Sequence, residues 1–290
     1  MKFRRLCIIG VGLIGGSLAR ALRRSGDCGE IVGVGRNADN LRRAVELGVI
    51  DRYETDPARG VEDADRVVLA VPLGAMEPVL NAIAPHLAPD VVVTDAGSAK
   101  AWVLEAVRAV FGSVPPFFVP GHPIAGTEKS GVEAALPELF EGRRVILTPE
   151  PETDPQAVQV VGEMWEACGA RVTRMSAAHH DEVLAATSHL PHVLAFTLVD
   201  SLAAMGEREE IFQYAAGGFR DFTRIASSDP VMWRDICMAN RDDLLALIER
   251  YLNDLGVVTD LINTGNWDGL LAVFQRAKAA RDRFTDGTPG

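Results

Sequence analysis

Short apolar runs rich in β-branched residues alternate with longer stretches of mixed character as far as about residue 175. The runs fall at residues 6–10, 31–35, 66–72, 91–97, 117–123, 144–149 and 170–175. Strand-like runs separated by helix-like stretches are typical of βαβ units around a parallel sheet. The pattern therefore predicts an N-terminal α/β domain, residues 1–175, with a doubly wound, mainly parallel sheet.

The pattern changes after Met175, where the strand-like runs stop. An Ala-rich stretch from Ser176 and two amphipathic stretches, 240–255 and 267–284, all predict helices. Asp229 followed by Pro230 predicts a helix start, with an N-cap residue before a proline at the first helical position. We expect an all-α C-terminal domain over residues 176–284 and a frayed polar tail over residues 285–290.

The apolar positions of the stretch 240–255 follow helical spacing. They are Leu244, Leu245, Ile248, Tyr251, Leu252 and Leu255. The simplest interpretation is a core face, but helices this rich in apolar positions could equally pack against a second copy of the chain. We expect a homodimer formed through the helical domain.

Composition narrows the class of protein. The chain has 29 Lys+Arg against 40 Asp+Glu, a net charge of −11, which argues against a general nucleic-acid binder but allows an anionic small substrate held by local cations. The four cysteines lie far apart, without metal-ligand spacing, as in a reduced cytoplasmic protein. No uninterrupted apolar segment approaches the length of a membrane span, and glycines break the apolar N-terminus that resembles a signal peptide.

A glycine-rich turn, GVGLIG at residues 10–15, directly follows one strand-like run and directly precedes a helix-like stretch. In this context the motif predicts a Rossmann-type dinucleotide site, with the pyrophosphate at the helix N-terminus. A glycine turn without a ligand is the alternative, and the strand–motif–helix order argues against it. The residues expected at the cofactor are Gly10, Gly12, Leu13, Ile14 and Gly15.

The next strand-like run ends near the expected ribose position. NAD sites usually carry an acidic residue there, but this chain has Gly35, Arg36 and Asn37. The absence of the carboxylate and the presence of Arg36 favour NADP over NAD, since a guanidinium can pair with the 2′-phosphate of NADP. The alternative is a solvated Arg36 near the adenine of either cofactor. Val71 and Pro72, after another run, are expected to line the nicotinamide side.

Candidate catalytic groups follow the later runs. Ligands of doubly wound sheets bind outside the carboxyl ends of the strands, where Ser98 and Lys100 follow one run and His122 ends another. Hydride transfer from a carbinol needs a group that accepts the hydroxyl proton, and histidine suits that role near neutral pH. His122 is the candidate base, although it could instead be a structural hydrogen-bonding group, and Ser98 could simply cap the following helix.

The helical half adds a histidine pair and a charged cluster. His189 and His192 flank Pro191, which should kink the helix and free carbonyl groups near both imidazoles. If these two histidines bound a metal ion, a third ligand at recognisable spacing would be expected, and none is present, so we expect no metal. Arg220, Asp221 and Arg224 lie within one helical turn of each other, and a local ion-pair network is the plain interpretation.

Several segments together resemble the prephenate/arogenate dehydrogenase family of tyrosine biosynthesis, over nearly the whole chain. They are GVGLIGGSLARAL, VVVTDAGSAK, GHPIAGTEKSGVEAA, SHLPHVLAF and FRDFTRIASSDPVMWRDI. The resemblance implies oxidative decarboxylation of prephenate to 4-hydroxyphenylpyruvate, or of arogenate to tyrosine, by hydride transfer to NAD or NADP. It leaves open which ring substrate is used and whether tyrosine inhibits at the active site.

The resemblance also implies roles for individual residues. His122 would assist deprotonation of the substrate 4-hydroxyl with support from Ser98, and Arg224 would hold a substrate carboxylate. The remaining residues assigned to substrate binding are His189, His192, Glu128 and Asp221, the two acids as a charged gate around Arg224. A related hydroxyacid dehydrogenase or imine reductase would leave HPIAGTEKSG unexplained, and a non-catalytic dinucleotide sensor would not need His122, Ser98 and Arg224 together.

Overall fold

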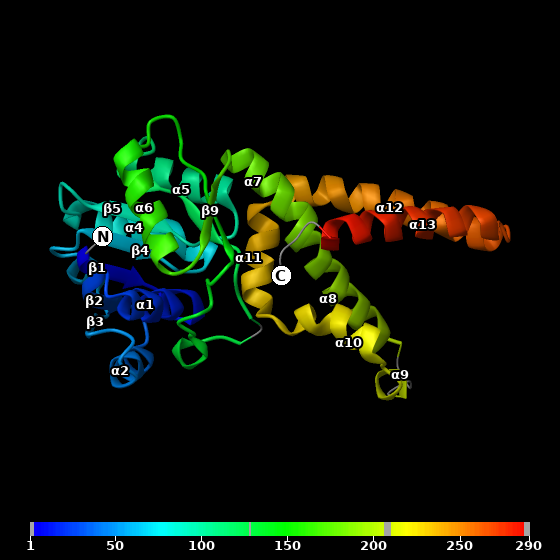
Figure 1. Cartoon of the computed structure of the whole chain (residues 1–290), viewed down its shortest axis with the longest axis horizontal. Helices are drawn as coiled ribbons and strands as arrows, with labels where there is room; N and C mark the ends of the chain where they lie inside the picture. The colour runs from blue at the N-terminus through cyan, green and yellow to red at the C-terminus, as the bar shows by residue number, and fades with distance from the viewer. Residues whose placement is uncertain (1–2, 128, 206–209, 287–290) are drawn as a thin grey trace. The chain divides into compact units, whose positions relative to one another are not determined.

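A six-stranded parallel sheet organises the N-terminal part of the computed structural model, which describes residues 3–127, 129–205 and 210–286 (Figure 1). Its strands are β1 (Phe3–Ile9), β2 (Cys28–Val34), β3 (Arg52–Glu54), β4 (Arg66–Leu69), β5 (Val92–Asp95) and β6 (Phe118–Val119). Their order is β3-β2-β1-β4-β5-β6, the doubly wound arrangement. The sequence pattern missed β3, because its three residues, Arg-Tyr-Glu, make no apolar run.

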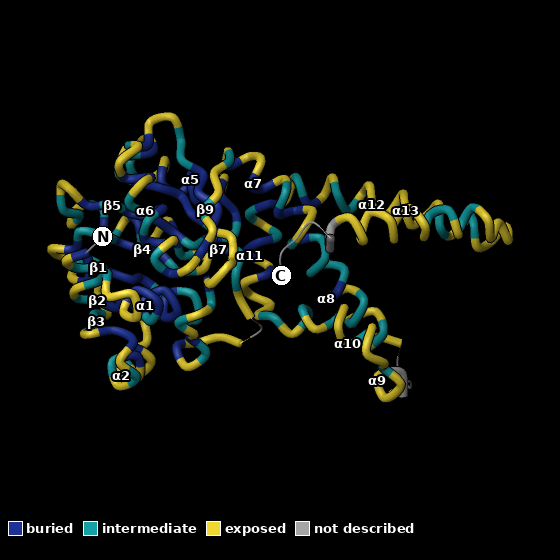
Figure 2. Tube along the Cα trace, in the orientation of Figure 1, coloured by how far each residue is buried: buried dark blue, intermediate teal, exposed yellow. Residues whose placement is uncertain are grey.

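Helices cover both faces of this sheet. Leu6 and Ile8 of β1 pack in one buried cluster with residues of α1 (Leu13–Ser25), α2 (Ala38–Glu46) and α6 (Pro155–Ala167). Cys7 and Ile9 pack in another with residues of α4 (Met76–Ile83) and α5 (Lys100–Phe111), near the short α3 (Pro57–Gly60). Because successive strand side chains point to opposite faces, β1 contributes to both clusters. The buried trace in Figure 2 runs through these strands.

The run 117–123, predicted as one strand, divides at Pro120 into two strands of different sheets. β6 closes the parallel sheet, whereas β7 (Gly121–Pro123) pairs antiparallel with β8 (Arg144–Leu147), which pairs parallel with β9 (Arg171–Arg174). Proline has no N–H for a strand ladder, and the Pro120 carbonyl accepts instead from the Thr148 N–H. The division places His122 on the short second sheet.

The helical part follows β9, with no further strand among the described residues. It comprises α7 (Ala177–Leu184), the π-helical turn η4 (Ala185–His189), α8 (Leu190–Ala203), α9 (Glu210–Gln213), α10 (Gly217–Thr223), η5 (Arg224–Ser227) and α11 (Pro230–Ala239). Asp229 caps α11 by accepting from the Met232 N–H at 2.8 Å, as predicted. The α/β fold class with a helical C-terminal part is therefore confirmed.

These first helices pack onto the sheet domain. Ala177, Trp233 and Ile236 join the buried cluster of α4 and α5. By packing, the chain forms the compact units Met1–Arg241 and Asp242–Gly290. The run Ala177–Ala203 is long and apolar enough by composition to cross a membrane. Length and composition alone do not make the run a membrane span, and it contains the buried His180, which is hydrogen-bonded to His122 and Asp181.

The second unit is a pair of helices longer than the sequence predicted. α12 spans Arg241–Asn263 and α13 spans Trp267–Asp286. Residues 285 and 286 of the expected tail are therefore helical, and residues 287–290 lie outside the described part. The helices approach closely, since a Cβ added at Gly269 would lie 2.7 Å from the Leu261 side chain.

Much of the predicted apolar stripe on α12 is not core. Leu244 is buried, but Tyr251, Leu252 and Leu255 are exposed. On α13, Trp267 is also exposed. The hairpin thus buries less apolar surface than its pattern predicts.

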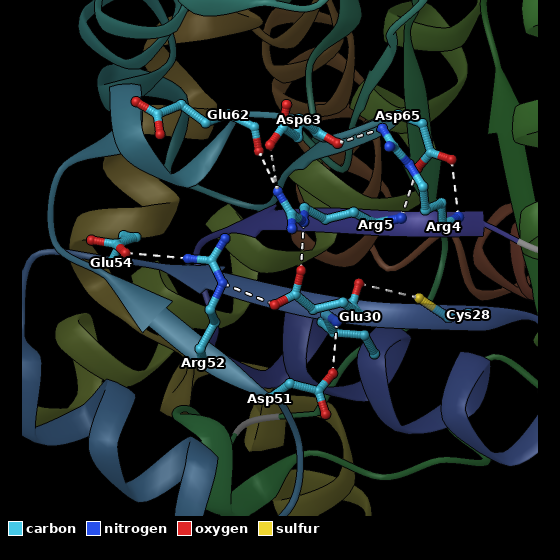
Figure 3. A network of polar contacts seen from close by, with 11 residues as sticks. Arg4, Arg5, Cys28, Glu30, Asp51, Arg52, Glu54, Glu62, Asp63 and Asp65 are labelled. Carbon is cyan, nitrogen blue, oxygen red and sulfur yellow. Dashed lines mark hydrogen bonds and ion pairs between the residues drawn. The ribbon is translucent and has the colours of Figure 1, made fainter.

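A charged network joins the first three strands at their opposite end from the glycine turn (Figure 3). The Glu30 carboxylate accepts from Arg5 Nε at 2.5 Å and from Arg52 Nε at 2.9 Å. Burial acts against ionisation, but hydrogen bonds from Arg52 and Arg5 outweigh it and lower the pKa of Glu30. The network holds neighbouring strands β1, β2 and β3 together through side chains.

Candidate functional site

The glycine turn adopts the geometry that a dinucleotide site requires. Gly10 has φ +101°, and a Cβ there would lie 2.2 Å from the Ala70 carbonyl oxygen. A Cβ at Gly15 would lie 2.2 Å from the Gly10 carbonyl oxygen, because α1 packs directly against the sheet. Both positions therefore exclude any side chain.

The start of α1 fits an anionic ligand. Gly12 is the N-cap, a Cβ added there would meet no atom within 4 Å, and no side chain caps the helix. Leu13 and Ile14 form the first turn, which carries no acidic residue, so its N–H groups are available to a phosphate. The turn is thus open on the side where a pyrophosphate would bind.

The residues expected near the rest of the cofactor differ in their local roles. Arg36 is exposed directly after β2. The Asn37 side chain caps α2, accepting from the Asp39 N–H at 2.9 Å and the Asn40 N–H at 3.1 Å. Val71 is half-buried and Pro72 exposed after β4, at the same sheet edge as the glycine turn. Asn37 therefore has a structural role that the sequence interpretation did not include.

A buried ion pair, Lys100 with Asp95, lies beneath the segments that carry Ser98 and His122. Lys100 Nζ lies 2.5 Å from Asp95 Oδ2 and 2.6 Å from the Gly121 carbonyl oxygen, and both charged side chains are fully buried. Asp95 also accepts from the N–H groups of Gly97 and Gly121, at 2.7 and 3.1 Å. Lys100 is thus a structural cation, and Asp95 holds together the segments that precede Ser98 and His122.

Ser98 does not cap the helix that follows it. The N-cap of α5 is Ala99, without a side-chain cap of its own. Asp181, from α7, instead accepts from the N–H groups of Lys100 and Ala101, at 2.8 Å each. The half-buried Ser98 hydroxyl is therefore not required by α5.

His122 lies at the end of a hydrogen-bonded line that runs from Asp181 through His180. Its Nδ1 is 2.8 Å from Nε2 of His180, whose own Nδ1 is 2.7 Å from Asp181 Oδ1. His122 is half-buried, whereas His180 is fully buried. Burial first, then the neighbouring His180, Lys100 and His189, holds the pKa of His122 well below its ordinary value. The imidazole is therefore neutral at pH 7 and able to accept a proton.

The π-helical turn brings His189 into the same region. Asn240 Nδ2 donates to the Asp181 carbonyl at 2.8 Å and lies 3.1 Å from His189 Nδ1. Burial lowers the pKa of His189 to about 4. Because the amide nitrogen is a donor, His189 Nδ1 accepts and its proton lies on Nε2. A neutral His189 therefore presents a donor N–H.

His192 lies one turn beyond. Its Nδ1 donates to the Ser188 carbonyl at 2.8 Å. The ring stacks on Trp233 at 3.6 Å between centroids. Burial, and then the charge of Arg224, lowers the pKa of His192, the Ser188 carbonyl acting in the opposite direction. Arg224 and His192 are thus near enough to interact electrostatically.

The charged residues expected at the substrate are more exposed. Arg224 begins η5 with an exposed side chain, and Asp221 is exposed on α10. Glu128 lies outside the described residues. The structure therefore brings together His122, His189, His192 and Arg224 as one connected group, while it does not describe the expected charged gate.

Sequence reasoning missed three neighbouring residues that support this group, His180, Asp181 and Trp233. A signal was present for two of them, since His179-His180-Asp181-Glu182 places four titratable residues at the start of a predicted helix. Trp233 could not be distinguished from an ordinary core aromatic. Among the described residues, its buried indole N–H is one of the few polar groups without a hydrogen-bond partner.

The sheet order, the glycine turn and the neutral imidazole define a dinucleotide-dependent oxidoreductase. The chain matches the description "Prephenate dehydrogenase, nucleotide-binding domain" over residues 18–174 and "Prephenate dehydrogenase, dimerization domain" over residues 176–276. These two matches cover most of the sequence. The chain therefore belongs to the prephenate dehydrogenase family.

Individual relatives agree with this assignment. The chain is 40% identical to cyclohexadienyl dehydrogenase of Zymomonas mobilis, covering 96% of this chain and 95% of the relative. It is 36% identical to prephenate dehydrogenase of Bacillus subtilis, covering 96% and 75%. The crystal structure of prephenate dehydrogenase from A. aeolicus with hydroxyphenyl propionate and NAD+ superposes with a TM-score of 0.91 at 39% identity, covering 98% and 99%.

Replacing Lys100 by Met tests the buried ion pair. The change leaves the Asp95 carboxylate without its cation in the protein interior, so the free energy of unfolding should fall by about 3–5 kcal/mol. Urea unfolding followed by circular dichroism measures the loss. Lys278→Met is the matched control, because Lys278 pairs with Asp282 at the surface and its removal should leave the transition essentially unchanged. Equal stability of both variants would contradict the role of Lys100.

Proposed function

We propose that this protein catalyses the oxidative decarboxylation of prephenate to 4-hydroxyphenylpyruvate in tyrosine biosynthesis. The observation that carries the proposal is His122, a neutral imidazole on the short strand β7 that directly follows the last strand of the six-stranded sheet. Relatives named prephenate and cyclohexadienyl dehydrogenase support the substrate class. The A. aeolicus relative was crystallised with a hydroxyphenyl acid and NAD+, which supports both the ring and the cofactor class.

His122 acts as the general base. It accepts the proton of the 4-hydroxyl while Ser98 hydrogen-bonds the same oxygen. A nicotinamide cofactor held at the glycine turn of Gly10, Gly12 and Gly15 would supply the acceptor for the hydride of the carbinol carbon. The ring carboxylate leaves as carbon dioxide, its bonding electron pair completes the aromatic ring, and the proton on His122 returns to the ring oxygen. Protons and electrons therefore balance without a further reactant.

Arg224 holds a substrate carboxylate. A guanidinium can pair with a carboxylate through two parallel hydrogen bonds, and Arg224 lies near His192 in the structure. His192 and the donor N–H of His189 complete the polar surroundings. The charged gate expected around Arg224 would include Asp221, while Glu128, its other expected member, lies outside the described residues. Arogenate is the second candidate substrate, since an exposed acid such as Asp221 offers a partner for its amine.

The cofactor preference follows from the end of β2. Arg36 is exposed where NAD-specific sites carry a carboxylate, so we infer a preference for NADP. NAD is the alternative cofactor, because the A. aeolicus relative was crystallised with NAD+.

A homodimer through the helical part is the expected assembly. The hairpin of α12 and α13 exposes large apolar side chains that two helices alone do not cover. They are Leu245, Tyr251, Leu252, Leu255, Val257, Ile262, Trp267, Leu271 and Phe274. The description "dimerization domain" covers residues 176–276. The free cysteines Cys7, Cys28, Cys168 and Cys237 support a cytoplasmic location, because that compartment keeps thiols reduced.

The function is tested by initial rates of nicotinamide reduction with prephenate and arogenate, each offered with NAD and NADP. Turnover of prephenate is expected. His122→Asn should lower kcat by about 10²- to 10⁴-fold because the base is lost, with nucleotide Kd unchanged. Arg224→Ala is the comparison for His122→Asn and should chiefly raise KM for prephenate, because it removes a binding contact and leaves the base in place. Absence of turnover with every pair, despite nucleotide binding, would overturn the proposal.

The role of Arg36 is tested by the ratio of kcat/KM for NADP and NAD. Arg36→Ala should reduce this ratio by about tenfold or more, since it removes a charge-assisted contact to the 2′-phosphate. Arg59→Ala provides a control at another arginine of the sheet domain. A ratio that is the same in wild type and Arg36→Ala would leave Arg36 as a solvated charge.

The dimer is tested by sedimentation equilibrium, with a mass near twice the 31.2 kDa of the chain expected for wild type. Charges in the apolar surface should disfavour association, so Leu252→Asp with Phe274→Asp should shift the mass toward that of a monomer. Asp254→Asn, a polar change on the same helix, is the control. A wild-type monomer at micromolar concentration would contradict the assembly.

A further inference from the structure

The carboxylate of Asp181 determines the direction of the hydrogen bonds that reach His122. Both of its oxygens accept backbone N–H groups at the N-terminus of α5, those of Lys100 and Ala101. A carboxylate held by two such donors is ionised and can only accept. His180 must therefore donate from Nδ1 across the 2.7 Å contact to Asp181.

His180 in turn determines the direction of its own hydrogen bond with His122. It is fully buried, and burial lowers its pKa, with the Asp181 hydrogen bond acting in the opposite direction, so the ring is neutral. A neutral imidazole protonated on Nδ1 has a lone pair on Nε2. Across the 2.8 Å contact, Nδ1 of His122 is consequently the donor. The remaining nitrogen of His122, Nε2, then carries no proton.

We propose that His180 and Asp181 are positioning residues that hold His122 in the tautomer protonated on Nδ1, leaving Nε2 as the base. The proposal rests on the proposed function for its catalytic meaning, but the tautomer itself is a property of the resting protein. When Nε2 of His122 takes the substrate proton, the new positive charge faces the His180 lone pair, behind which lies the Asp181 carboxylate. The α5 N-terminus holds that carboxylate in place.

Histidine ¹⁵N spectroscopy tests the tautomer directly. In ¹⁵N-labelled wild-type protein at neutral pH, two-bond proton–nitrogen correlations should show a protonated Nδ1 and an unprotonated Nε2 for His122. The His122→Asn variant assigns the signals. A His122 ring protonated on Nε2 would overturn the proposal, whether or not the protein turns over prephenate.

Two variants at His180 separate positioning from packing. His180→Gln retains a side-chain oxygen able to accept from His122 Nδ1, whereas His180→Leu has a similar size and no acceptor. His180→Leu should lower kcat with prephenate by about 10- to 10²-fold and give mixed tautomers of His122, with nucleotide Kd unchanged. His180→Gln should recover about tenfold of that loss. Equal kcat values for Gln and Leu would indicate packing alone and reject the proposal.

Controls keep the two hypotheses apart. His179 is exposed and next to His180 in sequence, so His179→Leu should change neither kcat nor the His122 spectrum. If His180→Leu fails to fold, the wild-type spectrum still decides the tautomer. The expected tautomer without turnover of prephenate would reject the proposed function alone, while turnover with the opposite tautomer would reject the positioning role alone.

Discussion

The buried ion pair between Asp95 and Lys100 is the constraint on which the positions of Ser98 and His122 depend. A charge in the interior must be paired and its remaining hydrogen-bonding groups satisfied, or the fold loses several kcal/mol. Here the carboxylate satisfies backbone groups of Gly97 and Gly121 as well as the ammonium, and the ammonium also binds the Gly121 carbonyl. Ser98 and His122 directly follow these two glycines. One carboxylate therefore sets the positions of two segments that lie more than twenty residues apart.

Asp181 extends this arrangement into the helical part. Its carboxylate supplies the cap that α5 lacks locally, so α7 is joined to the sheet domain by two charge-assisted hydrogen bonds. The same carboxylate orients His180, and its carbonyl group accepts from Asn240. Helix capping and orientation of the imidazoles thus depend on one residue. A change at Asp181 would therefore disturb both the cap of α5 and the orientation of His180.

Sequence reasoning succeeded where the chemistry is local. The glycine turn is a continuous motif whose demands on Gly10 and Gly15 follow from backbone geometry. The cap at Asp229 is equally local. His122 was singled out by its place after a strand-like run, although the division of that run at Pro120 was not foreseen. Where residue type and position within a short segment decide the structure, the pattern was sufficient.

The rest depends on contacts distant in the chain. His180 meets His122 across 58 residues and Asp181 meets Lys100 across 81, so no local pattern could reveal either. Lys100 looked like a site cation because it follows a strand, and only the fold shows that Asp95 neutralises it. The packing of α7 and α11 on the sheet domain likewise joins segments that lie far apart in the chain. Packing between distant segments decides all three outcomes.

In the proposed reaction the histidines and Arg224 have different roles, proton transfer for His122 and recognition of the anionic groups for Arg224. Burial lowers the pKa of His122, His189 and His192, so all three are neutral at pH 7 and supply no charge to attract an anion. The lowered pKa makes His122 a weaker base, but it also ensures that the ring is unprotonated before substrate arrives. Aromatisation of the ring supplies the driving force that a weaker base lacks. In the proposed function, recognition of the anionic groups falls to exposed Arg224, a local cation through which a chain of net charge −11 would bind an anionic substrate.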